Sequence, residues 1–153
     1  MSTRNEARSI TILLVEDNPG DVRLIQEIFR DGKIFNRMDI AEDGEQAMNY
    51  LQQQGEYENK PRPDLILLDL NLPRKNGIEV LTEIKADEIL RRIPVIVLTA
   101  SMAEEDIVRA YSHFVNCYLT KPIDLNQFIR VVQQIKSFWL DIVELPTSDL
   151  YER

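Results

Sequence analysis

The chain has few cysteine and histidine residues, which small proteins use to form disulfides or to bind structural metal ions. It has one cysteine and one histidine in 153 residues, so no intramolecular disulfide can form and no Cys/His cluster of metal-ligand spacing exists. We interpret Cys117 as a small buried side chain on a strand and His113 as a helix-end or surface residue. A single domain of this length can bury a core by packing alone.

The chain also lacks a positive net charge and any long apolar run. Its formal net charge is −8, whereas nucleic acid and anionic lipid both attract basic surfaces. The start, MSTRNEARS, has no apolar core of a secretion signal, and no apolar run approaches the roughly 18 residues of a membrane helix. These absences argue against nucleic acid and membrane as partners and predict a globular, cytoplasmic protein.

Short aliphatic runs alternate with helical patterns. Five runs are interpreted as strands, and most are continuously apolar, which is typical of strands covered on both faces: 10–16, 38–41, 64–69, 94–100 and 117–121. Five helices are expected: one after the cap Asn18–Pro19, one from a Ser101–Glu104 capping box, and three at 43–54, 77–86 and 124–136. The alternation predicts an α/β fold, a doubly wound five-stranded parallel sheet with helices on both faces.

The expected organisation is a tail (1–9), one domain (10–140) and a C-terminal extension (141–153). The polar stretch GEYENKPRP (55–63) is interpreted as a surface connection within that domain, because the strand after it continues the same sheet pattern.

The stretch DLILLDLNLP (64–73) places Asp69 where a core strand would carry another Leu or Val. In a parallel α/β sheet, the residues at the carboxyl ends of the strands gather at one edge. The same rule brings Glu16, Asp17, Thr99 and Lys121 to that edge. Each residue alone could have an ordinary structural role, such as a helix cap or turn former for an Asp. Such structural roles do not predict, however, that all of these residues lie at the same edge of the sheet.

Carboxylates crowded at one edge repel one another unless a cation lies among them. Lys121 supplies one positive charge, and Mg²⁺ could supply two, because it prefers oxygen ligands and fills its octahedron with waters and phosphate oxygens. A phosphoryl group is thus an implied ligand. Asp69 is the candidate nucleophile, because a carboxylate can attack a phosphoryl group and form an aspartyl phosphate.

At these residues the sequence resembles the receiver domain of two-component response regulators. The segments LLVEDNPGD, LILLDLNLP, VIVLTAS and CYLTKP occur in the family's order, and the resemblance covers roughly residues 10 to 136. It implies a flavodoxin-like sheet with Asp69 as phosphoacceptor. It also implies a Mg²⁺ site formed by Asp69, Glu16, Asp17 and the backbone carbonyl of Asn71.

The same resemblance assigns roles on the neighbouring strands. Thr99 and Lys121 are expected to bind the phosphoryl oxygens. Tyr118 matches an aromatic switch position whose ring turns inward as Thr99 moves, although a core tyrosine with its hydroxyl satisfied at the edge is the simpler alternative. The Lys121–Pro122 bond matches one that is often cis in the family.

A narrower resemblance is to response regulators that work with cyanobacterial phytochrome histidine kinases, in LQQQGEYENKPRPDLILLDLNLP, VNCYLTKPIDL and SFWL. It implies a phosphoacceptor signalling protein, not an enzyme, that receives its phosphoryl group from the phosphohistidine of a sensor kinase. The chain ends too soon after the last helix for a DNA-binding output domain, so the signal is expected to leave by protein contact.

Apolar residues continue at helical spacing into the tail: Phe128, Ile129, Val132, Ile135, Phe138, Trp139 and Ile142. This stripe either packs on its own sheet or meets a second copy, because Trp and Phe are favoured at interface centres. The resemblance favours a homodimer through the last strand, the last helices and the C-terminal extension.

Two other classes share part of this pattern. A haloacid-dehalogenase-like Mg²⁺-dependent phosphatase also uses an Asp nucleophile after a strand, but it needs a second Asp where this chain has Asn71. A flavodoxin-like cofactor binder needs a glycine- or hydroxyl-rich phosphate loop after the first strand, where this chain has the acidic VEDNPGD. Both classes fit the sequence less well than a receiver.

Overall fold

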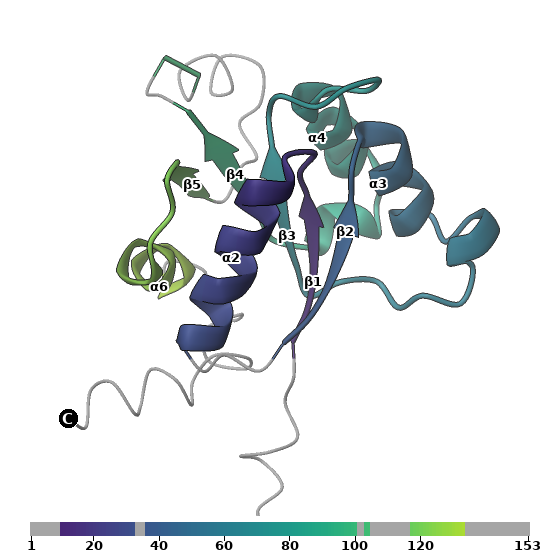
Figure 1. The fold of residues 1–153 in the computed structure, drawn as a ribbon. Helices are drawn as coiled ribbons and strands as arrows, with labels where there is room; N and C mark the ends of the chain where they lie inside the picture. Colours follow the sequence, from purple (N-terminus) through teal and green to yellow (C-terminus); the bar gives the residue numbers. More distant parts are fainter. Residues whose placement is uncertain (1–9, 33–35, 101–102, 105–116, 134–153) are drawn as a thin grey trace, which may run out of the picture.

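The computed structural model describes residues 10–32, 36–100, 103–104 and 117–133. Five parallel strands form one sheet in the order β2-β1-β3-β4-β5 (Figure 1). Their bounds are β1 Ile10–Val15, β2 Asn36–Ala41, β3 Leu65–Asp69, β4 Val95–Thr99 and β5 Cys117–Thr120. The expected α/β fold with a five-stranded parallel sheet is confirmed, although the second strand begins two residues earlier than the sequence predicted.

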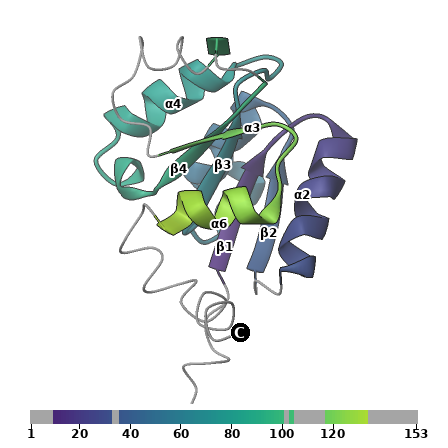
Figure 2. The same ribbon diagram turned by 90° about the vertical axis from the view of Figure 1, so that its left-hand side faces the viewer.

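In the described ranges, four helices cover the sheet, α2 and α6 on one face and α3 and α4 on the other (Figure 1 and Figure 2). Their bounds are α2 Pro19–Asp31, α3 Gly44–Leu51, α4 Gly77–Ala86 and α6 Leu125–Gln133. Two short 3₁₀ turns, η1 Gly55–Tyr57 and η2 Leu90–Arg92, lie in the connections. Within the described part of the chain, none of the helices has both the length and the apolar character needed to cross a bilayer.

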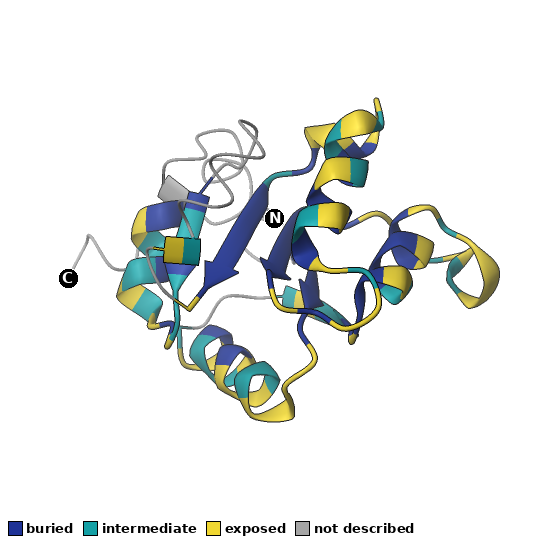
Figure 3. Ribbon diagram, turned by 90° about the horizontal axis from the view of Figure 1, so that it is seen from above, coloured by how far each residue is buried: buried dark blue, intermediate teal, exposed yellow. Residues whose placement is uncertain are grey.

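The continuously apolar strands are explained by two separate cores. In β1, β3 and β4, alternate side chains point to opposite faces of the sheet and are buried on both. Leu13, Ile66 and Val97 pack under α3 and α4, and the residues next to them pack under α2 and α6. Figure 3 shows the buried strands between helices whose outer faces are exposed. On the second face, Phe29 of α2 meets Phe128 of α6 with ring centroids 4.6 Å apart.

The helices begin at side-chain caps. The Asn18 side chain accepts a hydrogen bond from the Asp21 N–H at 3.0 Å, as the sequence predicted. Asp43 caps α3, and Asn76 with Glu79 forms a capping box at the start of α4.

The helix expected at 43–54 ends early, at Leu51, because Gln53 and Gly55 take positive φ angles of 58° and 62°. The proposed Ser101 cap and His113 lie outside the described residues.

The loop that follows β3 is held tightly between α3 and α4. The Gly77 N–H donates to the Leu70 carbonyl at 3.0 Å and closes the loop. Arg74, which has a φ of 66°, forms ion pairs with Asp43 at 3.4 Å and Glu45 at 3.8 Å. The loop that begins after Asp69 is therefore anchored to the start of α3.

Gly44 is the position where this anchoring is most sensitive to a side chain. A Cβ there would lie 1.9 Å from the Lys75 carbonyl oxygen. We expect Gly44→Ala to lower the free energy of unfolding by about 2–4 kcal/mol in urea titrations, because backbone must move to admit the methyl group. Gly20→Ala is the control, because its Cβ would meet only the Asn18 side chain, at 3.2 Å, and it should change stability by less than about 1 kcal/mol. Equal stability of the two variants would contradict the close approach.

Candidate functional site

Four charged side chains meet at the carboxyl ends of β1, β3 and β5. Asp69 is the last residue of β3, Glu16 and Asp17 follow β1, and Lys121 follows β5. Glu16, Asp17 and Asp69 each offer a carboxylate oxygen within 4.8 Å of the others. Glu16 is 1% and Asp69 4% exposed, whereas Asp17 is exposed. The structure thus brings together the acids that the sequence placed at one edge.

Lys121 is the cation of this cluster. Its Nζ lies 2.9 Å from Glu16 Oε1, 3.1 Å from Asp21 Oδ2 and 3.5 Å from Asp69 Oδ2. The bond between Lys121 and Pro122 is cis. Asp21, in the first turn of α2, was not among the residues that the sequence indicated, because an acid there is explained by the helix dipole alone.

The pKa values of Glu16 and Lys121 are both raised. Burial is the main cause that raises the pKa of Glu16 from its ordinary value of 4.5 to about 7; the charge of Asp69 acts in the same direction, and the hydrogen bond from Lys121 opposes both effects. Burial lowers the pKa of Lys121, but the hydrogen bond to Glu16 and the charge of Asp69 outweigh burial and raise this pKa above its ordinary value. The edge therefore holds a permanently charged ammonium beside a carboxyl group that favours a proton when no further cation is present.

The acids fit the ligand preference of a hard divalent cation. Carboxylate oxygens are ligands that Mg²⁺ and Mn²⁺ take, and the three acids are near enough to share one ion. A cation would also offset the repulsion that raises the pKa of Glu16. The donor set of this edge therefore suits a divalent metal.

Asn71 links two of the loops at this edge. Its backbone N–H donates to Asp69 Oδ1 at 3.4 Å, and its side-chain amide donates to Glu104 Oε2 at 3.0 Å. The other oxygen of Glu104 accepts from the Ala100 N–H at 2.8 Å. Glu104 therefore connects the loop after β3 to the loop after β4. The sequence suggested only a helix cap for Glu104, because no local pattern links residues 33 positions apart.

Thr99 and Tyr118 lie on the neighbouring strands β4 and β5. Thr99 is fully buried, and its hydroxyl donates to the Leu119 carbonyl at 3.5 Å, toward β5. Tyr118 is half-buried and packs against the core under α3 and α4. Their roles at a phosphoryl group stay predictions. Cys117 is buried on β5, as the sequence predicted, and burial raises the pKa of its thiol.

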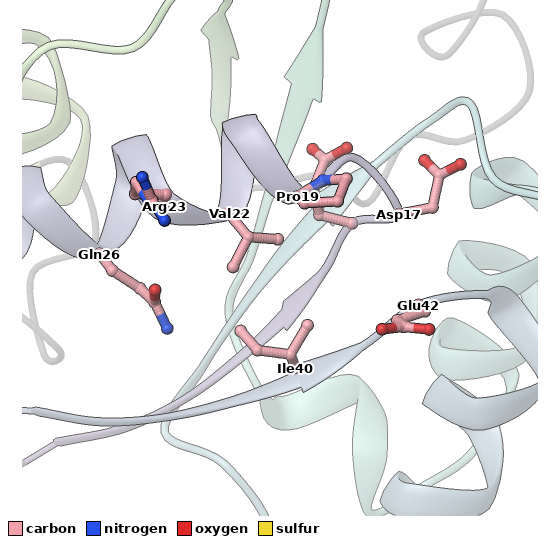
Figure 4. A pocket seen from close by; sticks show the side chains of 8 residues that line it. Asp17, Pro19, Val22, Arg23, Gln26, Ile40 and Glu42 are labelled. Atoms are coloured by element: carbon pink, nitrogen blue, oxygen red, sulfur yellow. The ribbon is translucent and has the colours of Figure 1, made fainter.

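A cavity of about 360 Å³ opens beside the acidic cluster, between α2 and β2. Val22 of α2 and Ile40 of β2 point toward each other across it, with Asp17 and Glu42 at one end (Figure 4). Pro19, Arg23 and Gln26 of α2 also line it, as does Glu16 of the acidic cluster. The acidic cluster is therefore open toward the edge strand of the sheet.

The raised pKa of Glu16 predicts a pH dependence in the absence of metal. The folded state holds this proton up to about pH 7, whereas the ordinary value is 4.5, so the stabilisation is present below pH 4.5 and is lost as the pH rises through 7. Glu16→Gln cannot titrate at this position. We therefore expect the free energy of unfolding of the variant, minus that of the wild type, to increase by on the order of 2 kcal/mol between about pH 5 and about pH 8.

The measurement is urea unfolding of both proteins with EDTA across this pH range. A difference between the two proteins that stays constant with pH would contradict the raised pKa.

Comparison with known proteins identifies the family of the chain. A family model described as the response regulator receiver domain matches residues 12–133. Response regulator Rcp1 of Synechocystis sp. is 56% identical over 137 residues, which are 90% of this chain and 93% of that protein.

Two solved structures are similar as well. The phosphorylated cyanobacterial phytochrome response regulator RcpA is 52% identical, with a TM-score of 0.71 over 86% of this chain and 94% of that one. The Mn²⁺-bound form of Rcp1 is 55% identical, with a TM-score of 0.70 over 86% and 95%. The phosphatase alternative receives no support, and the resemblance to receivers, including those of phytochrome systems, is confirmed. The chain therefore belongs to the response regulator receiver domain family.

Proposed function

We propose that this response regulator accepts a phosphoryl group on Asp69 from the phosphohistidine of a sensor histidine kinase. The observation that carries the proposal is the environment of Asp69. Its carboxylate is 4% exposed, with the Asn71 N–H at one oxygen and the Lys121 ammonium at the other. A carboxylate held by donors at a parallel-sheet edge is placed to attack phosphorus and not merely to form a cap.

In the proposed transfer, an Asp69 oxygen attacks the phosphorus and the bond from phosphorus to the histidine nitrogen breaks. The electron pair of that bond stays on the histidine, and the phosphoryl group becomes an acyl phosphate on Asp69. Lys121 neutralises charge on the phosphoryl oxygens. The protein is then a phosphoacceptor of a signalling pathway and not an enzyme with a separate substrate.

Mg²⁺ is the proposed cofactor, held by Glu16, Asp17, Asp69 and the backbone carbonyl of Asn71. When bound, it neutralises charge that develops on the equatorial phosphoryl oxygens. The three carboxylates that lie together support this ligand set. The Mn²⁺-bound structure of the similar Rcp1 supports a divalent ion at such a site.

Thr99 and Tyr118 are proposed to carry the change outward. Among the described residues, the Thr99 hydroxyl donates one long hydrogen bond of 3.5 Å, to the Leu119 carbonyl, and a phosphoryl oxygen would offer it a stronger, charged acceptor. Movement of Thr99 would open space for Tyr118 to turn inward. The output is a changed protein surface, and a net charge of −8 disfavours nucleic acid as the partner.

The proposed kinase is a cyanobacterial phytochrome. The similar Rcp1 and RcpA support this partner, since RcpA is described as a cyanobacterial phytochrome response regulator and its solved structure is phosphorylated. A phytochrome kinase of this kind would place the protein in the cytoplasm.

Phosphorylation is tested by incubation with acetyl phosphate and Mg²⁺ followed by intact-mass measurement. We expect the wild type to gain one phosphoryl group and Asp69→Asn to gain none, because the amide is not a nucleophile. EDTA should abolish the adduct, and Asp17→Asn should require a higher Mg²⁺ concentration. The matched control is Asp31→Asn, at the exposed end of α2, which should behave as the wild type. An adduct of equal size on Asp69→Asn would exclude Asp69 as the acceptor.

We further propose that the domain, residues 10–140, forms a homodimer through β5, the last helices and the extension, residues 141–153. Phe128, the first residue of the apolar stripe, is 1% exposed in the core against α2. The start of the apolar stripe therefore packs on its own sheet. We propose that the later members Ile135, Phe138, Trp139 and Ile142, which lie outside the described residues, meet a second copy.

Truncation after Lys136 tests the dimer, because it removes Phe138, Trp139 and Ile142 while leaving the buried Phe128. We expect light scattering to give the mass of a dimer for the full chain and of a monomer for the truncated one. The double variant Phe138→Ala, Trp139→Ala provides a second test in a chain of full length, and it should also shift the protein from dimer toward monomer. A truncated chain that remains dimeric would rule out this interface.

A further inference from the structure

We infer that Asp21 is a positioning residue for Lys121, which fixes the lysine ammonium so that one of its N–H groups faces Asp69. This inference rests on the proposed function, in which Lys121 binds the phosphoryl group on Asp69. It adds a residue that neither the sequence pattern nor the acidic cluster itself includes.

The contacts of Lys121 carry the inference. An ammonium group has three N–H donors and no acceptor, and Lys121 has three carboxylate oxygens around it. Hydrogen bonds of 2.9 Å and 3.1 Å join it to Glu16 and Asp21. Asp69 is third, at 3.5 Å. Two donors are thus bound on the β1–α2 side, and the third is left directed at the acceptor residue.

Glu16 cannot hold the lysine alone during phosphoryl transfer. Its Oε2 accepts the Asn18 N–H at 3.3 Å, and its carboxylate belongs to the group of acids that would hold a cation. A bound cation would compete with Lys121 for the charge of Glu16. Asp21 lies outside that group of acids, so its contact with Lys121 is available whether or not a metal is present.

Asp21 is also well placed to define a position. It lies in the first turn of α2, its N–H donates to the Asn18 cap at 3.0 Å, and Pro19 begins the helix. Its side chain is 38% exposed, so a substitution there removes little packing. A helix provides a more rigid support for a functional contact than a loop does.

The test is the rate of Asp69 phosphorylation by acetyl phosphate at saturating Mg²⁺, so that altered metal affinity does not enter. We expect Asp21→Ala to lower the rate about tenfold, because a misplaced lysine loses much of its effect on the phosphoryl oxygens. Asp21→Asn should lose less, about threefold, since its amide oxygen still accepts a hydrogen bond. Asp31→Ala, at the end of the same helix, removes the same charge and should leave the rate unchanged.

A second background separates positioning from a general effect. In Lys121→Met, the change Asp21→Ala should have no further effect on the rate, because the group that Asp21 holds is absent. An Asp21→Ala rate at or above that of the wild type would overturn the inference, and so would an equal loss in both backgrounds.

A readout without phosphorylation keeps this inference distinct from the proposed function. Lys121 should give a slowly exchanging ammonium signal in ¹⁵N NMR, identified by its loss in Lys121→Arg. We expect that signal to broaden or vanish in Asp21→Ala and to persist in Asp31→Ala. A signal that persists in Asp21→Ala refutes the contact, whereas failure of the wild type to gain a phosphoryl adduct refutes the proposed function instead.

Discussion

The site depends on one ammonium group that lies among carboxylates at the carboxyl edge of the sheet. Lys121 comes from the end of β5, and its partners come from β1, α2 and β3. Glu16 and Asp69 are nearly inaccessible to water, so their mutual repulsion is weakly screened. Without the lysine, burial of these acids would be unfavourable. The lysine therefore allows reactive carboxylates to sit inside an otherwise apolar edge.

The rest of the fold supplies a rigid frame around this contact. Two apolar cores fix the strands from both faces. The loop after Asp69 is closed at Gly77 and anchored at Arg74 to the start of α3. Glu104 then connects that loop to the one after β4. The described parts of the loops after β3 and β4 are thus tied to a helix or to each other, which keeps Asp69 in place at the edge.

Much of this arrangement could be predicted from the sequence, because strand ends in a parallel sheet share one edge. Asp69, Lys121 and the pair Glu16 and Asp17 follow from that rule alone. The contact of Asp21 with Lys121 could not be predicted, since it depends on where the first turn of α2 lies relative to a residue 100 positions later. The Asn71–Glu104 link and the direction of the Thr99 hydroxyl depend in the same way on tertiary packing.

The hydrogen bonds at the edge differ in strength in a way that fits a switch. Lys121 holds Glu16 and Asp21 through short, charge-assisted bonds, which are the strong kind. Within the part of the chain that the structure describes, Thr99 makes a long, neutral bond to Leu119, which costs little to exchange for a charged acceptor. A phosphoryl group on Asp69 would thus move Thr99 more readily than Lys121. In the proposed function, Lys121 would therefore be the part of the edge that binds the phosphoryl group, and Thr99 would be the part that responds to it.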